Sequence, residues 1–181
     1  MDVGVFGSSL PRPGEPAYDV AVDLGREIAR RGARVVCGGY SGVMEAVCRG
    51  AVEAGGSTRG VVLSGRGQPN AWLTETIVAR DLGSRLALLR DGSDAWIFLP
   101  RGLGTMLELV WVAESVVKRQ VRPRPLVLLG EFWRALVETA LAEAANPEGA
   151  AALGGVVRFV PTVPEAAVAA LAPPRPRGGE T

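Results

Sequence analysis

The sequence contains no histidine in its 181 residues. This absence excludes a Ser-His-Asp triad, a Cys-His pair and a zinc site built on histidine ligands. Any acid–base step must therefore use a carboxylate, a tyrosine, a thiol or water. Lysine is nearly absent too, because Lys118 is the only one. The chain consequently has no Gly-Lys-Ser or Gly-Lys-Thr ending of a Walker phosphate loop.

Cysteine and long apolar runs are also scarce. Cys37 and Cys48 are the only cysteines, too few for a disulfide framework or a clustered metal site, and we expect both to be small core residues. No apolar run reaches the ~18 residues of a membrane span. The start of the chain lacks the basic segment and apolar stretch of a secretory signal. We therefore expect a cytoplasmic protein with no membrane partner, no metal and no cofactor.

The charge balance gives no sign of a polyanionic partner. The formal net charge is +1, so no strong overall field favours nucleic acid or an anionic membrane surface. Hydrophobic residues make up 48% and charged residues 22%, as in ordinary globular domains, and the length suffices for one complete core. We expect a single nucleotide-binding domain over residues 1–172 and a disordered Pro/Arg/Gly tail over 173–181.

Short β-rich runs alternate with amphipathic helical stretches, which indicates βαβ units and a parallel sheet. The predicted fold is α/β: a Rossmann-like three-layer fold with a mostly parallel central sheet flanked by helices. Strands are expected at 3–6, 34–37, 60–63, 74–78, 95–99, 125–129 and 156–160. Helices are expected at 18–31, 43–54, 82–90, 106–118, 131–144 and 164–171. The polar and glycine-rich stretch 64–70 predicts an exposed loop.

Three glycine-rich loops each follow a predicted strand and precede a predicted helix. They cover residues 7–9, 38–42 and 102–105, and we call them the first, second and third glycine loops. Such strand ends meet at one edge of a parallel sheet, where backbone N–H groups and helix N-termini can hold an anion. The alternative is that the glycines only make tight turns. The residues predicted to bind a phosphorylated ligand are Gly7, Ser8, Ser9, Gly38, Gly39, Gly42, Met44, Arg101, Gly102, Gly104 and Thr105.

Glu108 and Arg85 are candidate functional residues, and each has a structural alternative. Glu108 lies in the first turn of the predicted helix 106–118, where a carboxylate could accept a proton, orient water or stabilise a cationic transition state. Its spacing from Thr105 is also that of a capping box, in which Glu108 would bond to the backbone. Arg85 could pair with a phosphate near the glycine loops, or it could be a surface arginine.

Aromatic and apolar side chains add further expectations. Tyr40, between glycines of the second glycine loop, could contact a ligand, whereas Trp96 and Trp111 fall on core-like positions and should pack. The helix 106–118 carries more apolar residues than one core stripe needs, which predicts the surface of a homodimer. The residues expected to form that surface are Leu109, Val110, Val112, Val116 and Val117.

Three motifs together resemble the cytokinin-activating LONELY GUY phosphoribohydrolases, a group often labelled lysine decarboxylase-like. They are Phe6-Gly7-Ser8-Ser9, Gly38-Gly39-Tyr40-Ser41-Gly42-Val43-Met44 and Pro100-Arg101-Gly102-Leu103-Gly104-Thr105-Met106-Leu107-Glu108. The last is similar to the family signature Pro-Gly-Gly-x-Gly-Thr-x-x-Glu. The resemblance implies a Rossmann-like homodimer that hydrolyses the N-glycosidic bond of nucleoside 5′-monophosphates and releases free base and ribose 5-phosphate. It also implies that Glu108 and Arg85 are catalytic and that the glycine loops hold the phosphate.

The chain departs from the family pattern at three positions. Arg101 replaces the second glycine of the signature, Leu107 replaces a commonly acidic residue, and Leu86 stands where the family has lysine. These departures fit a branch that resembles the molybdenum-cofactor carrier proteins, which share the fold and bind without catalysing. Two main hypotheses follow: an N-glycosidase of nucleoside 5′-monophosphates, and a non-catalytic carrier of a nucleotide-like ligand. A third is an interaction protein whose glycine loops only make turns.

A lysine decarboxylase is not expected, in spite of that label. A decarboxylase that uses pyridoxal phosphate needs a lysine to form a Schiff base. Lys118 is the sole candidate, and it lies about three turns along the predicted helix from the third glycine loop. At a rise of ~1.5 Å per residue, Lys118 is ~20 Å from Thr105.

Overall fold

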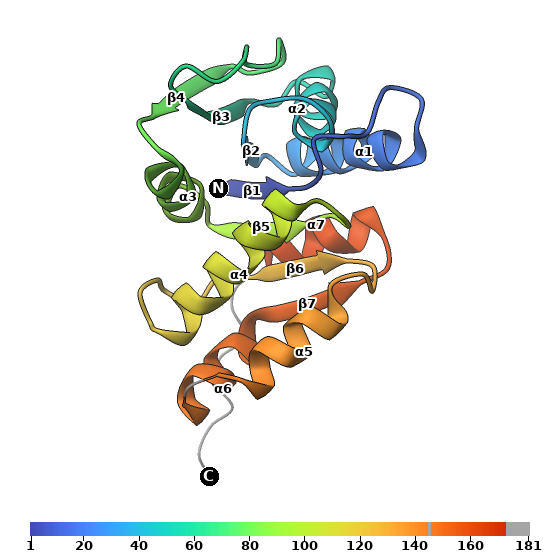
Figure 1. Ribbon diagram of the computed structural model, residues 1–181. Coiled ribbons are helices and arrows are strands. Elements are labelled where there is room, and N and C mark those ends of the chain that lie inside the picture. Colours follow the sequence, from blue (N-terminus) through green and yellow to red (C-terminus); the bar gives the residue numbers. More distant parts are fainter. Residues whose placement is uncertain (145, 173–181) are drawn as a thin grey trace.

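The computed structural model describes residues 1–144 and 146–172, so the predicted tail over 173–181 lies outside the described residues. A seven-stranded sheet of order β4-β3-β2-β1-β5-β6-β7 forms its centre, and all neighbouring strands are parallel (Figure 1). Helices pack on both faces, which confirms the predicted Rossmann-like three-layer α/β fold. The strands are β1 (Asp2–Phe6), β2 (Arg34–Cys37), β3 (Thr58–Leu63), β4 (Glu75–Ala79), β5 (Ala95–Phe98), β6 (Leu126–Leu129) and β7 (Val157–Val160).

The two helical layers bury opposite faces of the sheet. The helices are α1 (Pro16–Arg30), α2 (Val43–Glu53), α3 (Leu82–Asp91), α4 (Leu103–Val117), α5 (Arg134–Ala142), α6 (Pro147–Val156) and α7 (Val163–Leu171). Helices α1, α2 and α7 share one core cluster with Ala95 and Ile97, and α3 to α6 share the other with Trp96 and Phe98. Alternate side chains of β5 thus serve opposite layers, so the whole strand is buried.

Three helices differ most from the sequence prediction. Helix α4 begins at Leu103 instead of residue 106, because Gly102 takes the N-cap position with a φ of 100° that glycine adopts without steric cost. The predicted helix 131–144 is shorter, as α5, and the unpredicted α6 follows it. Asn146 caps α6 by accepting a hydrogen bond from the N–H of Gly149, and Pro147 stands at its first position. The glycines of α6 weaken its helical signal in the sequence.

The site expected at the strand ends lies where the order of the strands in the sheet reverses. Strands β1 and β5 are neighbours, and the rings of Phe6 and Phe98 stack with centroids 4.6 Å apart at their carboxyl ends. The chain adds β2 on one side of this pair and β6 on the other, and ligands of open α/β sheets bind beyond the strand ends at such a point. The first glycine loop follows β1, the second follows β2, and the third follows β5.

Several smaller predictions can be compared with the structure. Cys37 and Cys48 are both buried, as expected. Residues 64–69 form an exposed loop, and Asn70 is half-buried. Across residues 1–144 and 146–172, no helix has both the length and the apolar character needed to cross a membrane.

Candidate functional site

The three glycine loops pack directly on one another. The N–H of Val43 donates to the carbonyl of Ser8 over 2.9 Å, joining the first and second glycine loops. A Cβ on Gly42 would lie 2.5 Å from that carbonyl oxygen, and a Cβ on Gly102 would lie 3.2 Å from the Cα of Ser8. Gly42 and Gly102 also have φ values of 71° and 100°. These two close approaches therefore require glycine, and the sequence places glycine at both positions.

The loops also bring two helix N-termini to these strand ends. Gly42 precedes α2 and Gly102 precedes α4, and no side chain in the described part of the chain caps either helix. The first N–H groups of such helices lack partners within the helix and carry a partial positive charge. Ser8 lies beside them with a hydroxyl that accepts from the N–H of Leu10 over 3.2 Å. The arrangement suits a phosphate or carboxylate.

Arg85 is held inside the site by three neighbours. Its Nε donates to the carbonyl of Val61 over 2.8 Å, and its Nη2 donates to the carbonyl of Gly38 over 3.1 Å. Its Nη1 lies 3.5 Å from Oε1 of Glu108. The residue is 8% exposed, so the alternative of a surface arginine is wrong. Arg85 is buried because strand-end carbonyls and a carboxylate replace the water that its charge would otherwise need.

Glu108 faces Arg85 from the second turn of α4. The helix begins three residues earlier than predicted and Gly102 is its N-cap, so the capping-box alternative for Thr105 and Glu108 is wrong. The Glu108 side chain is 12% exposed. Burial raises the pKa of this carboxyl from 4.5 to about 7, although the charge of Arg85 acts in the opposite direction. A buried carboxyl with a pKa near neutrality can exchange a proton at physiological pH.

Tyr40 supports this ion pair from the second glycine loop. Its hydroxyl accepts a hydrogen bond from the N–H of Leu63 over 2.7 Å, and the Cζ of Arg85 lies 5.7 Å from its ring centroid. The sequence indicates Tyr40 only as a ligand contact; its place against Arg85 depends on tertiary packing that no local pattern reveals. The carbonyl of Val61 is a second partner that sequence reasoning misses, because backbone acceptors leave no residue signature.

The second glycine loop leaves no spare room around Arg85. A Cβ on Gly38 would lie 1.9 Å from Nη2 of Arg85 and 2.6 Å from the sulfur of Met44. Gly39 has a φ of 78° and is buried. Gly38 and Met44 thus lie beside Arg85. A Cβ on Gly39 would instead meet Val62, and Gly42 lies at the junction with the first glycine loop.

The remaining predicted residues lie around the third glycine loop and differ in exposure. Thr105 is buried, while Ser9, Gly104 and Arg101 are exposed. Arg101 has a φ of 75°, which is uncommon for a residue with a side chain. Its Cζ lies 5.8 Å from the ring centroid of Phe132, and within residues 1–144 and 146–172 no carboxylate pairs with it. Arg101 therefore presents an unpaired positive charge beside the loop.

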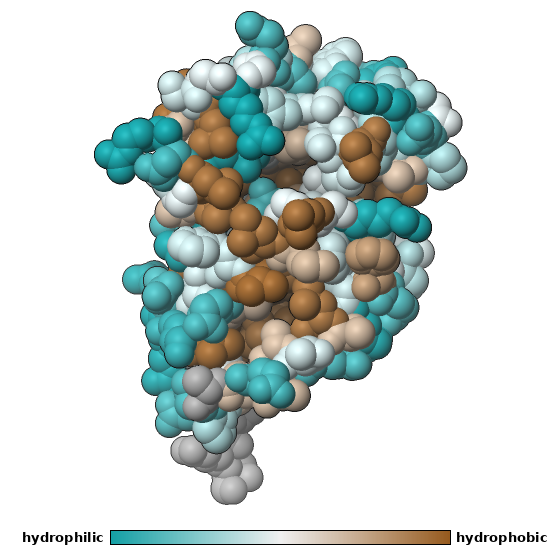
Figure 2. Space-filling view, viewed as in Figure 1, coloured by the Kyte–Doolittle hydropathy of each residue, from teal (hydrophilic) through white to brown (hydrophobic). Residues whose placement is uncertain are grey.

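The apolar residues of α4 are arranged differently from the prediction. Trp96 packs in the core as expected, but Trp111 is 37% exposed. Four residues expected on the surface are instead buried: Leu109, Val112, Val116 and Val117. The exposed apolar residues of α4, which we call the α4 strip, are Leu103, Met106, Leu107, Val110 and Trp111. Figure 2 shows apolar side chains gathered over α4 and the surface beside it.

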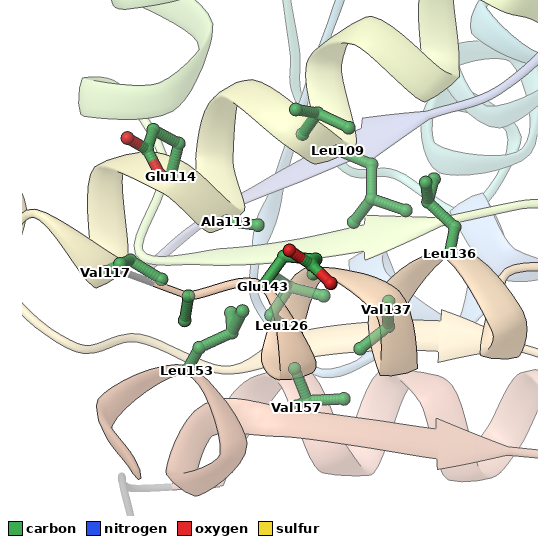
Figure 3. A pocket seen from close by; sticks show the side chains of 13 residues that line it. Leu109, Ala113, Glu114, Val117, Leu126, Leu136, Val137, Glu143, Leu153 and Val157 are labelled. Carbon is green, nitrogen blue, oxygen red and sulfur yellow. The ribbon is translucent and has the colours of Figure 1, made fainter. Parts of the chain in front are cut away.

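A separate apolar pocket of about 220 Å³ lies beside the α4 strip and shares Val110 with it (Figure 3). It opens between α4 and α5 over β6, with Leu109, Leu126 and Val137 among its walls. Its only charged lining residues are Glu114 and Glu143. Arg85 and Glu108 do not line it, so this pocket is distinct from the candidate site at the strand ends.

Comparisons with known proteins identify the family of this chain. The model of the SLOG cluster4 family matches residues 1–146. The cytokinin riboside 5′-monophosphate phosphoribohydrolase of Rhodococcoides fascians is 35% identical over 142 residues, which cover 75% of this chain and 71% of that protein. The predicted resemblance to these phosphoribohydrolases is thereby confirmed.

Two solved structures share the fold over nearly the whole chain. The molybdenum cofactor carrier protein of Chlamydomonas reinhardtii matches with a TM-score of 0.73 and 27% identity, covering 93% of this chain and 94% of that one. The molybdenum cofactor binding protein of Rippkaea orientalis matches with a TM-score of 0.71 and 25% identity, covering 92% of each chain. Since the family model spans most of the sequence, the chain belongs to the SLOG cluster4 family.

Proposed function

We propose that this protein is a phosphoribohydrolase that cleaves the N-glycosidic bond of a nucleoside 5′-monophosphate, releasing free base and ribose 5-phosphate. The observation that carries the proposal is the buried pair of Arg85 and Glu108 beside three converging glycine loops. The phosphoribohydrolase relative from Rhodococcoides fascians supports the same activity.

The substrate phosphate is assigned to the first and third glycine loops. The N–H groups at the start of α4, together with the hydroxyls of Ser8 and Thr105, would bind its oxygens. Arg101 adds a positive charge at the edge of this site. Phosphate binding would thus anchor the substrate with its sugar directed toward Glu108.

Glu108 is assigned the main chemical role. As a carboxylate it would stabilise the positive charge that develops at C1′ while the bond to the base breaks, and it would direct the attacking water. A pKa of about 7 suits a group that accepts a proton near neutral pH. Arg85 makes its bonds to Val61, Gly38 and Glu108, and so acts by holding the carboxylate in place.

A second candidate function is a non-catalytic carrier of a nucleotide-like ligand or a molybdenum cofactor. The two carrier and binding proteins named above, which match over more than nine-tenths of this chain, favour it. This function would use the same glycine loops and helix N-termini, without a bond being broken.

Incubation of the purified protein with a panel of nucleoside 5′-monophosphates, followed by chromatography, separates the two functions. A hydrolase releases free base and ribose 5-phosphate from at least one member of the panel. Calorimetric binding of a nucleotide without release of base would support the carrier instead. If no member of the panel is bound or cleaved, the result would contradict the hydrolase and a carrier of nucleoside 5′-monophosphates.

We also propose that the protein is a cytoplasmic homodimer that buries the α4 strip. The strip exposes five apolar side chains on one helix, and the apolar pocket between α4 and α5 adjoins it at Val110. An apolar surface of this extent on a small domain is typical of an interface with another protein. Because Glu108 belongs to α4, a partner on the strip would lie close to the mouth of the site and help to exclude water.

A further inference from the structure

Two cysteines stand in contact directly behind the second glycine loop. Cys37 ends β2 and Cys48 lies on α2, and their sulfur atoms are 3.4 Å apart. Both side chains are fully buried and both are free thiols. A typical buried cysteine is an inert small core residue, but two thiols in contact can be joined by oxidation.

We propose that Cys37 and Cys48 form a reversible disulfide, an oxidative modification site that controls the position of Arg85 relative to Glu108. The oxidant we assign is hydrogen peroxide, which is small and uncharged enough to reach a buried thiol through local opening. The Cys37 sulfur attacks the peroxide and becomes a sulfenic acid, with release of one water. The Cys48 sulfur then attacks the sulfenic sulfur, forming the S–S bond and releasing a second water. Two thiols and one peroxide thus give one disulfide and two waters.

The surroundings of the two thiols assign them different roles. The hydrogen bond with Cys48 lowers the pKa of Cys37 most, and the N–H of Gly39 and the charge of Arg85 act in the same direction. The hydrogen bond with Cys37 and burial raise the pKa of Cys48. Because the thiolate is the nucleophile, Cys37 is the thiol that reacts first and Cys48 the one that resolves.

The loop geometry connects this pair to the candidate site. A disulfide has an S–S length of about 2.05 Å, so the two sulfurs must approach each other by more than about 1 Å. The Cys37 sulfur accepts from the N–H of Gly39 over 3.3 Å, and the neighbouring carbonyl of Gly38 holds Nη2 of Arg85 over 3.1 Å. A Cβ on Gly38 would lie only 1.9 Å from Nη2, so a shift of this backbone must move Arg85. Oxidation therefore weakens the contact between Arg85 and Glu108.

The first experiment asks whether the disulfide forms. The full chain is treated with hydrogen peroxide and then unfolded in denaturant, where its remaining thiols are alkylated, and intact and peptide masses are measured. We expect a loss of about 2 Da, no alkylation, and a cross-linked peptide pair that dithiothreitol separates. Two alkylated thiols, or oxygen added to each sulfur without a cross-link, would overturn the proposal.

A matched variant and a second readout test the connection to the site. Cys48→Ser keeps Cys37 and cannot form the bond, so peroxide should leave it as a sulfenic or sulfinic acid. In the wild type, NMR of the Glu108 carboxyl should show a titration midpoint that moves by about 0.5 pH unit or more on oxidation. An unchanged midpoint in a fully oxidised sample would contradict the connection. Neither readout requires hydrolysis of a nucleotide, so both tests remain valid if the proposed function is wrong. If Cys48→Ser does not fold, the measurements on the wild type still test the proposal.

Discussion

Nη1 of Arg85 lies 3.5 Å from Oε1 of Glu108, and the two residues come from different helices of the same layer. Arg85 belongs to α3, which begins at a capping box formed by Asp81 and Ser84. Glu108 belongs to α4, which begins at Gly102. The contact therefore depends on where both helices start. It places a carboxyl of raised pKa next to the glycine loops, which is the basis of the proposed chemistry.

The stability of the protein should fall as pH rises through the range in which Glu108 ionises. The folded state holds this proton up to about pH 7, whereas an ordinary glutamate releases it near 4.5, so the folded state binds more protons between these values. The contribution of Glu108 to the free energy of unfolding should decrease by about 3 kcal/mol across this window. Urea unfolding of wild type and Glu108→Gln from pH 4.5 to pH 7.5 measures the difference. A difference that does not vary with pH would contradict the raised pKa.

Gly38→Ala should displace Arg85 and lower both stability and activity. The new methyl group would lie 1.9 Å from Nη2, so the arginine or the backbone must move, at a cost of about 1–3 kcal/mol. Gly155→Ala is the matched control, because a Cβ there meets nothing within 4 Å and the residue is helical. The control should be neutral or stabilising. Thermal unfolding compares the two, and equal stability of both variants would count against the tight packing around Arg85.

Arg101→Asn should bind phosphate more weakly without losing stability. Arg101 holds a φ of 75°, a conformation that asparagine adopts more readily, so the substitution should leave stability unchanged or increase it by up to about 1 kcal/mol. Loss of the positive charge beside the third glycine loop should weaken binding of a nucleoside 5′-monophosphate by about tenfold. Calorimetry and thermal unfolding give both values. Unchanged affinity would remove Arg101 from the binding site.

Val110→Glu should dissociate the proposed dimer. Val110 is 45% exposed in the middle of the α4 strip, where a buried charge would oppose association. Val168→Glu is the matched control, since Val168 is 55% exposed on α7, on the opposite face of the sheet. Sedimentation at micromolar concentration should give a dimer for the wild type and the control, and a monomer for Val110→Glu. A dimeric Val110→Glu would place the interface elsewhere, and a monomeric wild type would rule the dimer out.

The alternation of strands and helices was sufficient to predict the fold, because each strand is a short apolar run and most helices have an apolar stripe. Helix α6 was missed, since Gly149, Gly154 and Gly155 interrupt its pattern and its cap at Asn146 is a short signal. The start of α4 was placed three residues late, because a glycine N-cap gives no side-chain signature.

The sequence predicted the glycine loops correctly as features of the strand ends, because a strand followed by glycines and a helix has a local pattern. It did not predict the burial of Arg85 or its bond to the carbonyl of Val61, which lies on β3 and far away in the sequence. Likewise, the apolar residues of α4 gave no indication of which would be exposed. Those properties depend on packing between elements, and no pattern within one element contains them.

The most direct test compares wild type and Glu108→Gln on the nucleoside 5′-monophosphate that the wild type cleaves best. Both proteins should bind the nucleotide with similar affinity, because the phosphate contacts are unchanged. The variant should release base at least about 100-fold more slowly, since general acid–base groups typically contribute that much or more. Release at the wild-type rate by a folded Glu108→Gln would contradict the proposed role of Glu108, and with it the central claim of a catalytic Arg85–Glu108 pair.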